Sequence, residues 1–242
     1  MREAPSIDPK LKAAIDSAIE KEHLVRIRAY AVISATESGL NYIVEAILKK
    51  YHREDMLGPV YTSVKELSLN GAKANFKRIL FEDENLNTED DLEYEKGMDL
   101  FKQNLNENWV LEYGKKSKER KLYVDIFFDF NKDRLIVEVL NNRPISQKED
   151  KRIREKFHTA MRYDDIAQFY MEGGDSSEGA GMGIVLVTMM LKAQAIDPHL
   201  FTIRSDYREK TLARVEFPLS ADYQPNRQRF ITESNAELVL SV

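Results

Sequence analysis

Two segments around a short polar turn constrain the fold of this chain more than any other feature. Residues 121–129 (KLYVDIFFD) and 134–140 (RLIVEVL) are rich in β-branched and aromatic residues, which favour strands. The segment Asn131-Lys-Asp133 between them has the composition of a hairpin turn. The sequence therefore predicts two adjacent antiparallel strands in the middle of the chain.

Helical patterns dominate the chain before this hairpin. Apolar residues recur at helical spacing in three segments, and Gly58-Pro59 is expected to mark a break before the third. Asp8 and Pro9 are typical of an N-cap and a first-turn proline. Apolar and basic residues alternate between the first two helices, which predicts a strand. The expected elements are a helix at 8–22, a strand at 24–30, and helices at 36–51 and 60–80.

The rest of the chain alternates polar segments with regular ones. The acidic stretch 82–115 is interpreted as an irregular insertion with one short helix at 97–105. The polar stretch 146–178 is expected to form a lid. A helix at 184–193 and strands at 200–205 and 211–219 follow.

This order predicts an α+β fold, a two-layer α/β sandwich with a mixed, mainly antiparallel sheet and helices on one face. The expected division is an N-terminal helical extension (1–23), one domain (24–220) and a C-terminal tail (221–242).

Composition excludes several classes of function. The chain has 242 residues and no cysteine, so disulfides, thiolate metal sites and cysteine nucleophiles are absent. A net charge of −5 argues against a nucleic-acid partner. Because no apolar run approaches the roughly 18 residues of a membrane span, we expect no membrane association and a soluble, cytoplasmic protein.

Three polar residues share one face of the helix expected at 60–80. Glu66, Asn70 and Lys73 lie at i, i+4 and i+7, so their side chains stack over two turns. A carboxylate that orients water, an amide that ligates Mg²⁺ and an ammonium that neutralises phosphate are the groups that phosphoryl transfer needs. Taken alone, the triplet is more typical of a solvated helix face stabilised by side-chain pairs.

A glycine-rich segment precedes the apolar helix at 184–193. Gly179, Gly181 and Gly183 alternate just before Ile184-Val-Leu-Val187. Glycines allow the backbone to approach phosphate oxygens, and the start of a helix favours anions. The alternative interpretation is a flexible loop that leads into a buried helix.

Together these two motifs resemble the N-box and the glycine-rich G2 box of the GHKL superfamily, which includes gyrase-type ATPases, heat-shock chaperones, histidine kinases and MutL proteins. Residues 66–73 (ELSLNGAK) are similar to the N-box, and residues 179–187 (GAGMGIVLV) match the glycines of the G2 box. Residues 211–219 (TLARVEFPL) resemble the closing strand of the family, and residues 137–145 (VEVLNNRPI) occupy the place of its adenine-binding G1 box.

The resemblance implies a Bergerat ATP-binding fold with ATP and Mg²⁺ as cofactors. Glu66 would act as general base, Asn70 would ligate the metal, and Lys73 would contact phosphate. The remaining nucleotide contacts would come from the G1 box, the G2 box and the closing strand, at Asn141, Arg143, Ile145, Gly179, Gly181, Gly183 and Thr211.

The G1 box departs from the family pattern at two positions. Asn141 replaces the aspartate that accepts a hydrogen bond from adenine, which removes charge assistance of about 1 kcal/mol. Arg143 replaces a glycine and would crowd the pocket. Two functions therefore stay open: an ATP-dependent signalling ATPase or protein kinase, and a regulatory pseudokinase that binds a partner without turnover.

The resemblance also bears on partners. The layout is similar to histidine kinase catalytic domains and anti-sigma-factor serine kinases, which implies bacterial signal transduction as in a two-component system. A protein partner or phosphoacceptor is expected, and a homodimer is compatible. His23 precedes Leu24 and His52 precedes Arg53, so neither has the acidic neighbour typical of a phosphoacceptor histidine.

Overall fold

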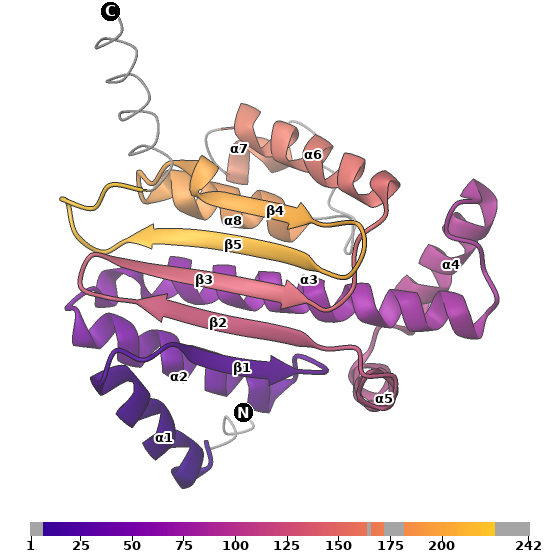
Figure 1. Cartoon of the computed structure of the whole chain (residues 1–242). Coiled ribbons are helices and arrows are strands. Elements are labelled where there is room, and N and C mark those ends of the chain that lie inside the picture. The colour runs from indigo at the N-terminus through magenta and orange to yellow at the C-terminus, as the bar shows by residue number, and fades with distance from the viewer. Residues whose placement is uncertain (1–6, 164–165, 172–181, 226–242) are drawn as a thin grey trace, which may run out of the picture.

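The computed structural model describes residues 7–163, 166–171 and 182–225. These residues form an α+β fold in which helices cover one face of a five-stranded sheet (Figure 1). The strand order is β1-β2-β3-β5-β4, and each of the four pairings is antiparallel. The strands are β1 (Val25–Ala29), β2 (Val124–Phe130), β3 (Arg134–Asn141), β4 (Phe201–Ser205) and β5 (Thr211–Pro218).

The helices differ in the part of the sheet that they border. In Figure 1, α2, α3 and α8 lie behind the sheet, α6 and α7 lie beyond its β4 edge, and α4 and α5 lie at one end of α3. This arrangement confirms the predicted two-layer sandwich, but the described sheet is antiparallel throughout and not mixed. The helices are α1 (Pro9–Glu20), α2 (Ser34–Lys50), α3 (Leu57–Asp83), α4 (Asp91–Asn104), α5 (Glu107–Glu119), α6 (Gln147–Arg162), α7 (Ile166–Met171) and α8 (Met182–Ala193), with short 3-10 turns at Glu54–Met56 and Pro198–Leu200.

The main hydrophobic core lies between the sheet and α2, α3 and α8. Ile126 and Phe128 from β2 pack there with Ile43 from α2, Val64 from α3 and Leu191 from α8. Their side chains are almost completely buried, and removal of such apolar surface from water is the main force that favours folding. The core holds α3 and α8 against the sheet, and these helices position the candidate site.

Local signals in the sequence are confirmed at the hairpin and at the first helix. The side-chain oxygen of Asn131 accepts hydrogen bonds from the N–H groups of Asp133 (2.9 Å) and Arg134 (3.0 Å), which closes the turn between β2 and β3. Asp8 caps α1 and accepts from the N–H groups of Lys10 (2.8 Å) and Leu11 (3.1 Å). Both are short-range contacts of the kind that neighbouring residues determine.

The expected irregular insertion is wrong in its detail. Residues 82–115 contain all of α4 and most of α5. Their aromatic residues form a second core with Phe76 of α3, in which the rings of Trp109 and Tyr113 stack at 3.8 Å and Phe101 meets Trp109 edge-on. The acidic residues lie on the solvent side of these helices, and this made the segment look irregular.

The boundaries of α3 and of the lid also differ from expectation. Gly58 and Pro59 lie inside the first turn of α3, where a proline leaves no helical hydrogen bond unmade. The first part of the predicted lid consists of α6 and α7, while residues 172–178 of the lid and 226–242 of the tail lie outside the described residues. No described helix is both long and apolar enough to cross a bilayer.

Candidate functional site

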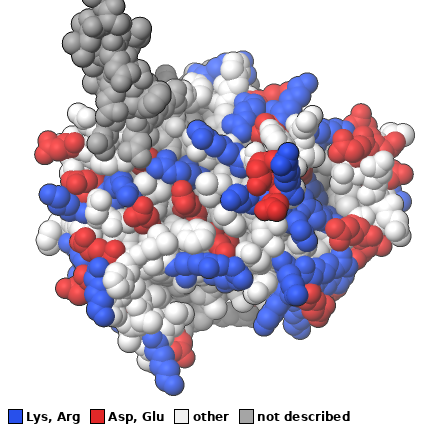
Figure 2. Space-filling model, viewed as in Figure 1, with Lys and Arg blue, Asp and Glu red and all other residues white. Residues whose placement is uncertain are grey.

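A cleft of about 1050 Å³ opens between α3, α4, α6 and the adjacent ends of β3 and β5. Eight of its lining residues are lysine or arginine and five are aspartate or glutamate, although the chain as a whole has a net charge of −5. Figure 2 shows Lys and Arg side chains gathered between α4 and the sheet. A concave surface with an excess of cations concentrates anionic ligands.

Three residues of the two sequence motifs meet where α3 contacts α8. Glu66 and Asn70 lie one turn apart on α3, and a Cβ atom at Gly183 of α8 would lie 2.6 Å from Asn70 Nδ2 and 2.9 Å from Glu66 Oε2. A side chain at this position would have to displace the ends of the Asn70 and Glu66 side chains, so glycine allows the close approach. Neither the Glu66 nor the Asn70 side chain forms a hydrogen bond or ion pair with another described residue, and both are half-buried.

The residues predicted for the adenine end of the pocket also lie together. Asn141, the last residue of β3, pairs with Thr211, the first residue of β5. The Asn141 amide donates through Nδ2 to the carbonyl of Gly71 on α3 (3.0 Å), and its Oδ1 accepts from the N–H of Arg143 (3.1 Å). Thr211 Oγ1 donates to the carbonyl of Arg143 (3.0 Å). These hydrogen bonds connect the end of β3 to α3 and the start of β5 to the segment after β3, at one wall of the cleft.

Two arginines of this wall lie close to each other. Arg78 on α3 donates through a guanidinium nitrogen to the carbonyl of Pro144 (2.8 Å), and Arg143 lines the same cleft. Burial lowers the pKa of Arg78, and the charge of Arg143 lowers it further against the opposing effect of Glu149. Neither arginine forms an ion pair with a described carboxylate, which suits them to an anionic ligand.

The start of α6 lines the cleft. Ser146 and Glu149 form a reciprocal capping box at this helix end, and Glu149 also pairs with Lys77 of α3. Burial opposes ionisation of Glu149, but the charge of Lys77 and its hydrogen bond outweigh this effect, so the Glu149 pKa lies below its ordinary value. The Arg152 guanidinium of α6 lies 4.2 Å from the ring centroid of Tyr94 on α4. The structure thus makes α4 a wall of the cleft.

The structure brings most of the predicted site residues together. Lys73, Arg143 and Ile145 line the cleft with Asn70, Asn141 and Thr211. Glu66 and Gly183 are not among its lining residues and lie next to Asn70. Gly179 and Gly181 lie outside the described residues, so their phosphate-binding role stays a prediction.

Sequence reasoning missed several residues that line the cleft, and part of the signal for them was present. Lys77 continues the Glu66, Asn70 and Lys73 series at helical spacing. Tyr94, Met98 and Phe101 have the same spacing in α4. No pattern in the sequence indicated that Asn75 and Arg78 line the cleft. They do so because the segment that follows β3 packs beside them.

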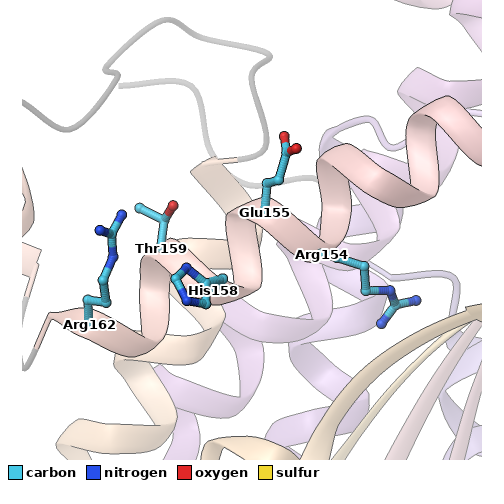
Figure 3. A pocket seen from close by; sticks show the side chains of 5 residues that line it. All are labelled: Arg154, Glu155, His158, Thr159 and Arg162. Atoms are coloured by element: carbon cyan, nitrogen blue, oxygen red, sulfur yellow. The ribbon is translucent and has the colours of Figure 1, made fainter.

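A second, shallower hollow of about 550 Å³ lies along α6. Figure 3 shows that its five lining side chains come from this single helix and do not converge: Glu155 points away from Arg154, on the opposite side of α6. A site that binds a small molecule gathers polar groups from several elements. The hollow on α6 lacks this feature, and the larger cleft has it.

Comparison with known proteins leaves the family open. No protein-family model matches the chain, and no solved structure matches it. The chain is 28% identical over 210 residues to an uncharacterised protein of Treponema pallidum (strain Nichols). This match covers 87% of the chain, which spans about 40% of the length of that relative.

Proposed function

We propose that the cleft binds ATP with Mg²⁺ and that the chain acts as a GHKL-type ATPase domain in signal transduction, where it phosphorylates or regulates a partner protein. The observation that supports this most strongly is the contact of Gly183 with Asn70 and Glu66. Two motifs with similarity to the N-box and G2 box, distant in the sequence, meet at one point.

The residues at this contact suit a magnesium–phosphate ligand. Mg²⁺ usually keeps several water molecules and is bound by one or two protein oxygens together with substrate phosphates. Asn70 supplies such an oxygen, and no group of three or more acidic or histidine residues in the described chain offers a competing metal site. When bound, the ion would neutralise phosphate charge. Lys73 would add a second positive charge, and Glu66 would orient the attacking group.

The second candidate is a regulatory binding module without turnover. The hydrogen bonds of Asn141 favour this candidate. Its Nδ2 and Oδ1 atoms both have partners within the protein, so the side chain is already engaged at the position where the family reads adenine. Exposed Arg143 also lies in the cleft at the position of a family glycine. The first candidate requires both nucleotide binding and turnover, whereas the second requires no turnover, so two successive measurements separate them.

The first measurement is thermal unfolding with and without millimolar MgATP. Ligand at about 100 times its dissociation constant raises the stability of the native protein by roughly 2.7 kcal/mol. We expect this shift in the native protein and in Asn41→Ala, a control on α2 outside the cleft. We expect its loss in Asn70→Ala. Absence of a shift in the native protein would exclude ATP binding at physiological concentrations.

The second measurement is release or transfer of labelled phosphate from ATP. An ATPase or kinase requires Glu66, so Glu66→Gln should still show the thermal shift but release no phosphate. If the native protein shows the shift and no turnover, the regulatory module is the correct function. If Glu66→Gln retains full turnover, the proposed role of this carboxylate is wrong.

A further inference from the structure

Arg78 and Arg143 lie close to each other at the wall of the cleft where α3 meets the segment after β3. The Arg78 guanidinium donates to the carbonyl of Pro144 (2.8 Å), the residue that follows Arg143 in the chain. Arg78 is half-buried, Arg143 is exposed, and both line the cleft. A ligand in the cleft can therefore reach both side chains.

The positive charge at this wall exceeds what the nearby carboxylates neutralise. Two carboxylates, Glu149 and Glu82, act on Arg78 by their charge. Each of them already has a cation of its own, because Glu149 pairs with Lys77 and Glu82 pairs with Arg120 (2.8 Å). The two arginines of the wall have no carboxylate partner among the described residues, so they leave two positive charges uncompensated.

The surroundings of Arg78 disfavour its charge. Burial lowers the pKa of Arg78, and the neighbouring charge of Arg143 lowers it further. An arginine nevertheless keeps its proton near neutral pH. A half-buried guanidinium beside a like charge is therefore destabilised until an anion supplies the missing countercharge.

The backbone of Arg143 is held in place without a ligand. Its N–H donates to Asn141 Oδ1 (3.1 Å), and its carbonyl accepts from Thr211 Oγ1 (3.0 Å). The Arg143 side chain forms no hydrogen bond or ion pair with a described residue, and Arg78 uses one N–H group on Pro144. The remaining N–H groups of the two guanidiniums suit the oxygens of an anion. A backbone that is fixed beforehand reduces the ordering that binding requires.

We propose that Arg78 and Arg143 bind a phosphate group, carried by a phosphorylated side chain or as free phosphate, at a site separate from the contact of Asn70 with Gly183. A phosphomonoester carries about −1.5 to −2 charge near pH 7, which matches two uncompensated arginines better than a carboxylate does. Asn70 and Arg78 are eight residues apart on α3, a rise of about 12 Å, so one phosphate group does not reach both points. The inference goes beyond the proposed function, because it requires neither ATP nor Mg²⁺.

Calorimetric titration in the absence of Mg²⁺ and nucleotide tests this site. The probes are inorganic phosphate, N-acetyl-phosphoserine amide and dimethyl phosphate, a diester with a single negative charge. They are titrated into native protein, Arg143→Gln and Arg78→Gln. Arg204→Gln is the matched control, because Arg204 is exposed on β4, does not line the cleft, and its loss changes the net charge equally. Lys73→Gln tests the alternative position beside the proposed magnesium contact.

We expect native protein, Arg204→Gln and Lys73→Gln to bind inorganic phosphate with the same affinity. Arg143→Gln and Arg78→Gln should each bind it about tenfold more weakly, the effect of one charge-assisted hydrogen bond. Dimethyl phosphate should bind native protein about tenfold more weakly than inorganic phosphate, because it carries less charge. Tighter binding of the phosphoserine compound than of inorganic phosphate identifies a phosphorylated side chain as the ligand, and the reverse order identifies free phosphate.

Arg143→Gln is the decisive variant, because the Arg143 side chain has no described partner and its loss leaves the fold intact. Native affinity in this variant overturns the inference. Equal weakening in Arg204→Gln shows general attraction to positive charge, and weakening in Lys73→Gln alone places the phosphate at the magnesium contact; both results also overturn it. So does the absence of phosphate and phosphoserine binding to native protein. The thermal shift with MgATP is a separate measurement, so this inference and the proposed function can fail independently.

Discussion

The two halves of α3 stabilise different parts of the molecule. The first half packs Val60 and Val64 into the main core, and its partners come from strands and helices distant in the sequence. The second half packs Phe76 and Ile79 against α4 and α5, which directly follow α3 in the chain. One helix therefore joins a core shared with many parts of the chain to a core formed mainly with the two helices that directly follow it. The cleft extends along both halves, and the two cores can be perturbed separately.

The largest expected effect comes from the second core. Phe76 is 2% exposed and packs edge-on against the rings of Trp109 and Tyr113. Phe76→Ala should destabilise the protein by about 3–5 kcal/mol, as removal of a buried aromatic ring usually does. If the two cores are separable, hydrogen exchange should accelerate in α4 and α5 while β2 and β3 stay protected.

Phe128→Ala provides the matched change in the main core, where Phe128 is fully buried. It should lower protection in all elements together, because its neighbours belong to the sheet and to three helices. Equal loss of protection throughout the chain in both variants would show that the molecule has one cooperative core. The proposed contrast between the halves of α3 would then be wrong.

Substitution of one glycine by alanine, at Gly97 in α4 or at Gly183 in α8, should have a smaller effect on stability. A Cβ atom at Gly97 of α4 would overlap the ring of Phe81, and one at Gly183 would overlap Asn70. Each change to alanine should destabilise the protein by about 1–3 kcal/mol through overpacking. Only Gly183→Ala should also weaken binding of MgATP, which the size of the ligand-dependent thermal shift would reveal.

Gly39→Ala is the control for both changes, because no atom lies within 4 Å of a Cβ atom built at this α2 position. It should raise stability by about 0.5–1 kcal/mol, as alanine does when it replaces glycine inside a helix. Equal loss of MgATP binding in Gly97→Ala and Gly183→Ala would show that α4 is as important for the ligand as α8.

The smallest effect concerns Glu149, which joins α6 to the second half of α3. Glu149→Gln should cost about 1–2 kcal/mol near neutral pH, because it weakens a cap and a charge-assisted hydrogen bond. The pKa of Glu149 is lowered in the folded state from its ordinary value of 4.5. Its ionised form therefore contributes stability above pH 4.5, and this contribution is lost as pH falls through the lower folded-state pKa.

Urea denaturation of native protein and Glu149→Gln at several pH values measures this contribution. The difference in free energy of unfolding should be constant above pH 4.5 and shrink at more acidic pH. Asp91→Asn removes the neighbouring pair with Lys148, in which the Asp91 side chain is 84% exposed, and should have no measurable effect. A difference between native protein and Glu149→Gln that does not depend on pH would exclude the ion pair as its cause.

The sequence by itself determined the elements whose signals come from neighbouring residues. The Asn131 turn, the Asp8 cap and the apolar spacing of α2 and α8 agree with the structure because each depends on residues a few positions apart. The same holds for the helical spacing of Glu66 and Asn70. Local periodicity was therefore sufficient for the α+β sandwich, whereas most of the proposed site residues came from the resemblance to the GHKL motifs.

Only the tertiary structure decided which groups in the cleft have partners. The acidic segment after α3 folds into α4 and α5 because aromatic residues spread over more than thirty positions meet Phe76, and no short window shows this. Asn141 follows Leu140 and Asn75 lies between Ala74 and Phe76, and these neighbours do not indicate which amide finds partners. The amide of Asn141 is satisfied by Gly71 and Arg143, whereas the oxygen of Asn75 is buried without a donor. That difference arises where a strand end crosses a helix, and long-range packing alone determines it.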